Sequence, residues 1–361
     1  MSSFQVKIVG DFCNVRCSYC RNRDFDQDAN TVMSDATLER LFIFLNSLQQ
    51  AQIRMNWHGG EPLLAGKKFF SHILKIENQY KQKSWVNSVQ TNAMLIDNEW
   101  ANIFQNNHFG IGVSIDGNEQ THNINRINVA GLGTYKKAMR GVEILRHHDI
   151  YPGVICTVTK KTVRRAKEIF RGLVDAGFKS IAFNAFYNTA SSYSEDDIYS
   201  LTNQEWLMFL TEIFESWLAL NDPSVHVREI DGILAWFKLK SSNSCLYKGA
   251  CHQWFVVYYT GDMYPCERFG KITHFGNINS FGTFHDLLNN STFLKWKETV
   301  ERLPKKCQCC NLQKLCHNGC VSHRKADAEG VPLYAYCESR LGFYNYIKNR
   351  LERKEVKNHV T

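Results

Sequence analysis

Three cysteines near the start of the chain have the spacing of a metal centre. Cys13, Cys17 and Cys20 form a C-x3-C-x2-C motif directly after the first segment that reads as a strand. Three thiolates in one loop can hold a single metal centre, and they are one ligand short of a closed zinc or iron–sulfur site. An open coordination position is a catalytic feature. The alternative is a structural zinc site with a distant fourth ligand such as His58.

A second group of cysteines lies toward the end of the chain. With Cys309 set aside as a non-ligand between two ligands, eight cysteines make two complete sets of four, which predicts two closed iron–sulfur sites suited to electron transfer. Two structural zinc ions are the alternative. Cys156, in an apolar strand-like run, reads as a small buried hydrophobic residue. The eight are Cys245, Cys251, Cys266, Cys307, Cys310, Cys316, Cys320 and Cys337.

Composition agrees with metal-binding cysteines. The 361 residues begin without a secretory signal and contain no apolar run of the ~20 residues that a spanning helix needs. We therefore expect a soluble cytosolic protein with no membrane partner, in which thirteen cysteines serve metals or catalysis rather than disulfides. The net charge of +8 fits either a solvated basic surface or an acidic partner. The sequence contains no arginine-rich block, so we expect no nucleic-acid partner.

Regular alternation of strands and helices must position these residues. Six strand-like runs, each followed by a helical pattern, precede residue 220 and predict a parallel sheet, either doubly wound or a partial barrel. In a barrel, chemistry belongs at the carboxyl ends of the strands, which is where the first cysteines fall. The runs are Phe4–Gly10, Ile53–His58, Trp85–Thr91, Ile111–Asp116, Val154–Thr159 and Ser180–Phe186. The helical patterns are Asp35–Gln49, with Ser34 as its N-cap, Phe69–Tyr80, Trp100–Asn107, Tyr135–His147, Val163–Ala176 and Glu205–Leu220.

The rhythm stops after residue 220. We expect a barrel over 1–220, a helical bridge over 221–244 and a metal-stapled domain with a C-terminal helix over 245–361. Because the first strand begins near Phe4, we expect no N-terminal peptide-recognition domain.

The first motif, with Tyr19 before its third cysteine, resembles the signature of the radical S-adenosylmethionine (SAM) enzymes. The resemblance implies a [4Fe-4S] cluster on Cys13, Cys17 and Cys20, SAM bound to its unique iron, and reductive cleavage of SAM to a 5′-deoxyadenosyl radical. It also implies a partial (β/α)6 TIM barrel and an electron donor such as flavodoxin or ferredoxin.

Further motifs resemble the SAM-binding elements of that family. Gly59, Gly60 and Glu61, followed by Pro62, resemble the GGEP motif that meets the SAM amino group. Paired glycines permit close backbone approach, and a carboxylate suits an ammonium. The other residues that the resemblance places in the SAM site are Gln90, Ser114, Asp116 and Arg126, the last with a surface ion pair as its alternative.

The second group matches the cysteine pattern of the SPASM domain, which occurs in radical SAM enzymes that modify peptides. The resemblance implies two auxiliary [4Fe-4S] clusters, which take up the electron left on a substrate radical. For the inner auxiliary cluster it implies Cys245, Cys251, Cys266 and Cys320 as ligands. For the outer one it implies Cys307, Cys310, Cys316 and Cys337.

Glu267 stands where sulfatase-maturing members of the family carry an aspartate thought to act as a base. We expect Glu267 to accept a proton, with a pKa raised by partial burial. An ion pair with Arg268 or a lysine is the alternative.

The surroundings at 264–269 and 316–320 look most like maturases of ribosomally made precursor peptides. We therefore expect an enzyme that joins an aromatic ring to a nearby Cβ of such a peptide, giving a cyclophane. The alternatives are an anaerobic sulfatase-maturing enzyme, which makes formylglycine, and a non-catalytic metal-binding scaffold.

Overall fold

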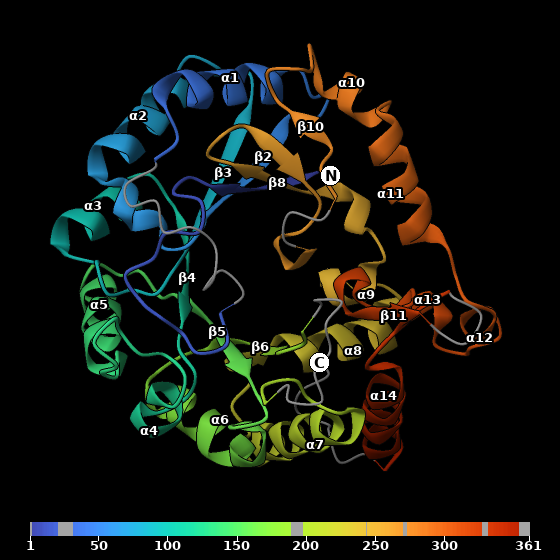
Figure 1. The fold of residues 1–361 in the computed structure, drawn as a ribbon. Coiled ribbons are helices and arrows are strands. Elements are labelled where there is room, and N and C mark those ends of the chain that lie inside the picture. The colour runs from blue at the N-terminus through green and yellow to red at the C-terminus, as the bar shows by residue number, and fades with distance from the viewer. Residues whose placement is uncertain are drawn as a thin grey trace. The chain divides into compact units, whose positions relative to one another are not determined.

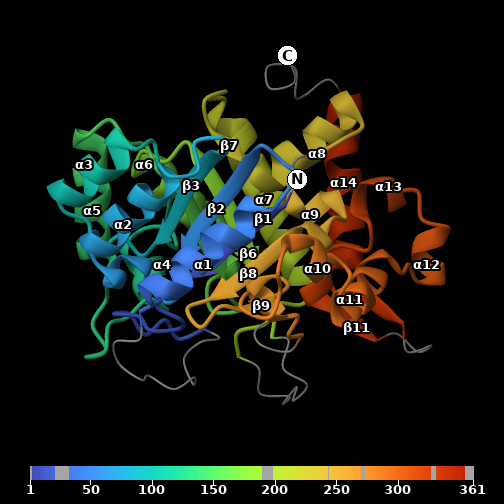
Figure 2. The ribbon, with the colours of Figure 1, turned by 90° about the horizontal axis from the view of Figure 1, so that it is seen from above.

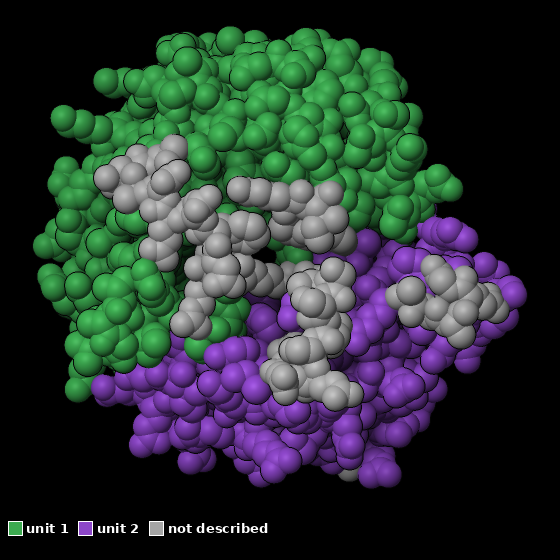
Figure 3. Space-filling view, viewed as in Figure 1, with its two compact units in different colours: residues 1–114, 127–152, 251–300 green, residues 115–126, 153–250, 301–361 purple. Residues whose placement is uncertain are grey.

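The computed structural model describes residues 2–20, 32–188, 198–242, 244–269, 273–326 and 331–353. The chain divides into two compact units, which Figure 3 distinguishes by colour. Unit 1 comprises residues 1–114, 127–152 and 251–300, and unit 2 comprises residues 115–126, 153–250 and 301–361. Both units are discontinuous in sequence, so they do not follow the boundaries expected near residues 220 and 244.

Unit 1 is built on a sheet with the strand order β10-β9-β8-β1-β2-β3-β4. The strands from β8 to β4 in this order run parallel, whereas β9 and β10 pair antiparallel with their neighbours. Because β8 pairs with β1, part of the cysteine-rich C-terminal segment joins the N-terminal sheet. The strands are β1 (Ser3–Lys7), β2 (Gln52–His58), β3 (Ser84–Thr91), β4 (Gly110–Ser114), β8 (Trp254–Tyr258), β9 (Asp262–Tyr264) and β10 (Gly276–Asn277).

Helices of unit 1 pack along the outer side of this sheet (Figures 1 and 2). As predicted, Ser34 caps α1, its hydroxyl accepting a hydrogen bond from the Thr37 amide at 3.1 Å. The apolar face of α1 is buried, including Leu38 and Leu41. The helices are α1 (Asp35–Asn46), α2 (Lys67–Glu77), α3 (Asn98–Asn106), α5 (Tyr135–His147), α10 (Phe284–Leu288) and α11 (Ser291–Glu301), with short 3-10 turns at Pro62–Ala65, Cys251–Gln253 and Glu267–Phe269.

Unit 2 combines three parallel strands with a helical layer. Its strands are β5 (Gly153–Val158), β6 (Ser180–Ala185) and β7 (His226–Val227), and a separate antiparallel pair joins β11 (Arg324–Ala326) to β12 (Pro332–Tyr334). The helices are α4 (Glu119–Asn123), α6 (Ala166–Asp175), α7 (Asn203–Leu220), α8 (Arg228–Leu239), α9 (Cys245–Lys248), α12 (Lys305–Gln308), α13 (Gln313–Cys316) and α14 (Cys337–Glu352). Short 3-10 turns lie at Val163–Arg165 and Val321–His323.

The long helices α7 and α14 pack side by side in unit 2 (Figure 1). Gly342 allows the close approach, because a Cβ at that position would lie 2.7 Å from the Leu207 side chain. Asn203 ties the start of α14 to α7, donating to the Ala335 carbonyl at 2.6 Å and accepting from the Ser339 amide at 3.0 Å. The beginning of α14 is therefore held firmly in place.

All six predicted strands are present, and each begins within one residue of its predicted start. Four strands end earlier than expected, β1 by three residues, β4 by two, and β5 and β6 by one each. The first stops at Lys7 because the chain turns there, with Gly10 at a φ of 57°. No helix in the described part of the chain is long and apolar enough to cross a membrane.

Candidate functional site

The first cysteine motif forms a loop at the carboxyl end of β1. The Cys20 amide donates to the Cys17 carbonyl at 3.0 Å, which tightens the loop between the two thiols. Burial, together with the Glu61 carboxylate and the other two cysteines, raises the pKa of the Cys13 thiol to about 12. Because the three sulfurs lie within electrostatic range of one another, a cationic iron centre would relieve this repulsion. The donor set therefore fits an iron–sulfur cluster.

Paired glycines seat the next loop against this one. The Gly60 amide donates to the Gly10 carbonyl, and the Glu61 amide donates to the Phe12 carbonyl, both at 2.9 Å. A Cβ at position 60 would lie 1.9 Å from the Phe12 carbonyl oxygen, so only glycine fits there. In this structure the close approach of Gly60 is thus to the cysteine loop itself.

Glu61 is fully buried and braces the site from within. Its carboxylate accepts from the Leu63 amide at 3.1 Å, the Thr91 hydroxyl at 2.7 Å and the Asn92 amide at 2.7 Å. Burial raises the pKa of Glu61 to about 7, although these three donors oppose the shift. The expected contact between Glu61 and the SAM amino group stays a prediction.

Two of these partners, Thr91 and Asn92, were not predicted as site residues. Thr91 and Asn92 directly follow Gln90, and their position in the same strand-end motif was the available signal. The Asn92 side-chain amide donates to Asn14 Oδ1 at 2.7 Å and lies 3.8 Å from Cys13 Sγ. Asn92 therefore links the end of β3 to both the buried carboxylate and the cysteine loop.

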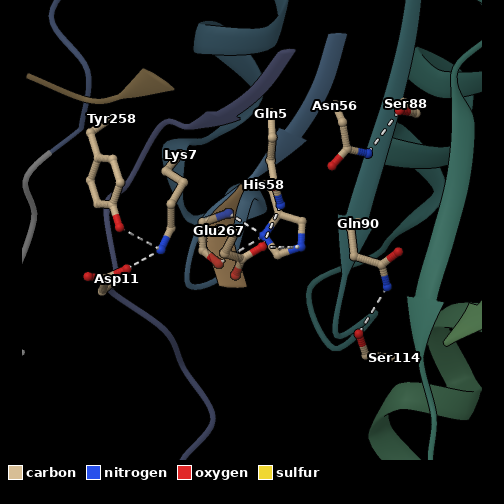
Figure 4. Close-up of polar contacts among 11 residues, drawn as sticks. Gln5, Lys7, Asp11, Asn56, His58, Ser88, Gln90, Ser114, Tyr258 and Glu267 are labelled. Atoms are coloured by element: carbon tan, nitrogen blue, oxygen red, sulfur yellow. Dashed lines mark hydrogen bonds and ion pairs between the residues drawn. The ribbon is translucent and has the colours of Figure 1, made fainter. Parts of the chain in front are cut away.

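Gln90 and Ser114 meet at the carboxyl ends of β3 and β4. The Gln90 side-chain amide donates to Ser114 Oγ at 3.0 Å (Figure 4). Gly112 leaves room for this contact, because a Cβ there would lie 2.2 Å from Gln90 Oε1. Asn56 and Ser88 form a second such pair, at 2.9 Å, one step further from the strand ends. These strands of unit 1 thus present a polar face.

Asp116 and Arg126 form a buried ion pair in unit 2. Arg126 Nε lies 2.9 Å from one carboxylate oxygen of Asp116, and the Thr157 amide donates to the other at 2.9 Å. Arg126 is only 8% exposed, so the alternative of a surface ion pair is wrong. Burial and the nearby Arg126 lower the pKa of His122 to about 3, so this histidine is neutral.

Glu267 lies among three side chains of β1 and β2 (Figure 4). Gln5 donates a hydrogen bond to Glu267 Oε2, and His58 Nε2 lies 3.5 Å from the same oxygen. Burial alone would raise the pKa of Glu267, but His58, then Lys7 and the Gln5 donor outweigh it and hold the pKa below its ordinary value. The expectation of a raised pKa is therefore wrong.

Lys7 contributes a fixed positive charge beside this carboxylate. Its side chain is fully buried, binds Asp11 and lies 3.4 Å from the Tyr258 hydroxyl (Figure 4). Burial would lower the pKa of Lys7, but Glu267, Asp11 and Tyr258 together raise it above its ordinary value. The ammonium therefore stays charged. The alternative of an ion pair with Arg268 or a lysine is supported in part, because both Lys7 and Arg268 lower the pKa of Glu267, beside His58.

Four cysteines converge in unit 2. Burial, together with the neighbouring thiols of Cys316, Cys337 and Cys310, raises the pKa of Cys307 to about 11. They come from α12, α13, the loop between these helices and the first residue of α14. This convergence fits the set expected for the outer auxiliary cluster. Cys309 is exposed.

The set expected for the inner auxiliary cluster is divided between the units, so it stays a prediction. Two of its members, Cys251 and Cys266, belong to unit 1, and Cys245 and Cys320 belong to unit 2. Within the described ranges, no three His, Cys, Asp or Glu side chains are grouped to hold a single metal ion. Cys156 is fully buried in β5, as predicted for a hydrophobic residue.

Comparison with known families gives matches to the segment with the first cysteine motif and to a segment with part of the second group of cysteines. The model of the radical SAM superfamily matches residues 7–171, and that of SPASM, an iron–sulfur cluster-binding domain, matches residues 245–311. A cysteine-type anaerobic sulfatase-maturating enzyme of Clostridium perfringens is 31% identical over 97% of both chains. The chain belongs to the radical SAM enzymes with a SPASM domain.

Other proteins similar to this radical SAM enzyme are also sulfatase-maturating enzymes. A serine-type anaerobic sulfatase-maturating enzyme of Klebsiella aerogenes is 29% identical over 89% of this chain and 80% of its own. The solved structure described as "Native anSMEcpe with bound AdoMet and Cp18Cys peptide" matches with a TM-score of 0.89 and 29% identity, over 98% of this chain and 99% of that one. The fold class, a radical SAM α/β core with a C-terminal SPASM domain, is therefore confirmed, as are SAM and [4Fe-4S] clusters as cofactors.

The expected cyclophane chemistry is wrong. The cysteine-type sulfatase-maturating enzyme matches over 97% of both chains, and the serine-type enzyme matches over 89% of this chain. The expectation rested on the surroundings of Cys266 and Cys316–Cys320, which contain cysteines expected to bind the auxiliary clusters. Such segments are constrained by iron–sulfur ligation and carry little information about the substrate.

Proposed function

We propose that this radical SAM enzyme is an anaerobic sulfatase-maturating enzyme that oxidises a cysteine of a sulfatase to formylglycine. The similarity to the cysteine-type enzyme over 97% of both chains carries this proposal. In the reaction, the CH2SH group of the cysteine and one water give an aldehyde, H2S, two protons and two electrons. When bound, SAM and the clusters supply hydrogen-atom abstraction and accept the remaining electron.

The proposed ligand sets rest on the cysteine pattern of the family. We assign Cys13, Cys17 and Cys20 to the SAM-binding cluster, and the two auxiliary sets as the family pattern implies. Tyr19, Gly59, Gly60, Glu61, Gln90, Ser114, Asp116 and Arg126 are proposed as the SAM site, the last two as a pair whose guanidinium is oriented by the buried carboxylate. The reductant is a donor such as flavodoxin or ferredoxin, in the cytoplasm.

Glu267 is the proposed acceptor of the proton that leaves as the substrate is oxidised. Its lowered pKa keeps the carboxylate ionised at neutral pH, as a base requires. Gln5 and His58 both contact Oε2, so within the described part of the chain Oε1 makes no hydrogen bond. The two contacts therefore orient the carboxylate and leave Oε1 to take the proton. Glutamate in place of the family's aspartate makes this arm one methylene longer.

The test is an anaerobic reaction of the reconstituted enzyme with matched peptides. The peptides carry the modification motif of a sulfatase with either cysteine or serine at the target position. We expect mass spectrometry to find the aldehyde, trapped as a hydrazone, from the cysteine peptide. The variant with alanine at Cys13, Cys17 and Cys20 serves as the control without radical chemistry. SAM cleavage by the wild type without any aldehyde would refute the proposed substrate, and iron binding without SAM cleavage would favour a scaffold.

A further inference from the structure

Arg340 lies in unit 2 against the sulfur of a proposed cluster ligand. Its Nη1 donates to Cys316 Sγ at 3.6 Å and to the Leu246 carbonyl at 2.7 Å, while Nη2 donates to the Tyr334 hydroxyl at 3.2 Å. Sulfur is a larger acceptor than oxygen, so 3.6 Å is an ordinary distance for such a contact. The guanidinium thus connects one ligand directly to the protein frame.

Two aromatic rings hold this guanidinium in one orientation. Its central carbon lies 4.7 Å from the ring centroid of Tyr247 and 4.5 Å from that of Tyr334. Contacts of this length are within the range of cation–π attraction, which grows as water is excluded. Arg340 is only 8% exposed. A planar guanidinium held in contact with two rings loses little further freedom when it donates to sulfur.

The positive charge of Arg340 has no carboxylate beside it. Within the described part of the chain its partners are a carbonyl, a hydroxyl, two rings and a thiol. A buried charge without a counter-ion is strongly unfavourable. Thiolate ligands of a cluster would supply the negative charge that the protein side chains here do not.

Helix α14 fixes the distance between Arg340 and the ligands. Cys337 is the first residue of this helix, and Arg340 follows three positions later, on the same helix face. Asn203 on α7 binds the Ser339 side chain at 2.7 Å and its amide at 3.0 Å, which anchors the first turn. The ligand and the guanidinium are therefore positioned by one rigid element.

We propose that Arg340 is a positioning residue that raises the reduction potential of the outer auxiliary cluster. One-electron reduction adds negative charge to the cluster and its thiolates. A fixed positive charge and an N–H···S hydrogen bond stabilise the reduced state more than the oxidised one. Such a cluster accepts an electron from a substrate more readily. The inference rests on the ligand set proposed above, and not on the identity of the peptide substrate.

The test is a redox titration followed by electron paramagnetic resonance. It uses full-length protein with alanine at Cys13, Cys17 and Cys20, so that only the auxiliary clusters give signals. The outer signal is the one lost on Cys310→Ala. Arg340→Met removes the charge and the donors, and we expect reduction of the outer cluster to become at least tenfold less favourable, a shift of about 59 mV to more negative potential. Arg340→Lys keeps the charge without the fork, so we expect a smaller shift in the same direction.

The inner cluster and Arg350→Met are the controls, and both should keep their potentials. Arg350 lies on the same helix and pairs with Glu215 at 2.6 Å. The inference is overturned by an unchanged outer potential in Arg340→Met at full iron content, or by equal shifts of both clusters. If Arg340→Met binds less iron, an unchanged potential in Arg340→Lys overturns it. A background protein without iron would refute the ligand set itself.

Discussion

Replacing Glu267 with glutamine separates the two halves of the proposed oxidation. The glutamine keeps the size and hydrogen-bonding shape of the side chain but cannot accept a proton at neutral pH. Loss of a positioned general base typically lowers a rate by roughly 10²- to 10⁴-fold. We therefore expect aldehyde formation to fall by about that factor, while cleavage of SAM to 5′-deoxyadenosine continues, because the side chains that contact Glu267, Gln5 and His58, lie outside the Cys13 loop.

The contribution of His58 can be worked from the same geometry. A partly exposed ion pair is worth about 0.2–1 kcal/mol, and the 3.5 Å separation of His58 from Glu267 is long. The two side chains are 21% and 28% exposed, so solvent screens the interaction. We take about 1 kcal/mol, which corresponds to a roughly fivefold loss of kcat in His58→Ala. His58→Gln retains a donor at that position and should recover most of the loss, with KM unchanged in both variants.

The assay measures 5′-deoxyadenosine and peptide aldehyde in the same anaerobic reaction. Asp262→Asn is the matched control, because Asp262 also lies in unit 1 and pairs with a histidine, His274, at 3.2 Å. That variant should keep both products. Aldehyde formation by Glu267→Gln within about twofold of the wild type would refute the base, and equal losses in His58→Ala and His58→Gln would refute the positioning role of the donor.

Two further predictions concern the framework of unit 1. Gly60→Ala should prevent the two loops from docking, because its Cβ would collide with the Phe12 carbonyl, and we expect loss of iron and of SAM cleavage. Gly110→Ala is the control: its Cβ would lie 3.6 Å from the nearest atom, so this variant should retain both. An iron content equal to that of the wild type in Gly60→Ala would contradict this. Burial raises the pKa of Glu77 from 4.5 to about 7, against the opposing hydrogen bond from Asn87. As the pH rises, the unfolded chain therefore loses the Glu77 proton at a lower pH than the folded chain does, so the free energy of unfolding falls between pH 4.5 and 7. Glu77→Gln should remove that slope and add up to about 3 kcal/mol of unfolding free energy above pH 7; denaturant titrations at several pH values check this, and an unaltered slope would count against it.

Much of the fold was predictable because it depends on local sequence patterns. Apolar alternation located all six strands before residue 220, and capping chemistry placed the start of α1 at Ser34. The membership of β8 in the N-terminal sheet was not predictable in this way. Its sequence, Trp254–Tyr258, is a short apolar run within a segment that lacks the βα rhythm. Its pairing with β1 depends on contacts between residues about 250 positions apart, which no local pattern records.

The charge state of Glu267 shows the same limit at the site itself. In β1 and β2 the parallel register places Lys7 opposite His58, and alternation along β1 puts Gln5 on the same face as Lys7. Glu267 follows β9 and reaches this face through the pairing of β8 with β1. The sequence identifies each residue separately. Burial raises the pKa of the carboxyl and the surrounding groups lower it, and this balance exists only after three distant segments meet. Because His58, Lys7 and the Gln5 donor together outweigh burial, the pKa of Glu267 lies below its ordinary value, whereas the sequence led us to expect a base with a raised pKa.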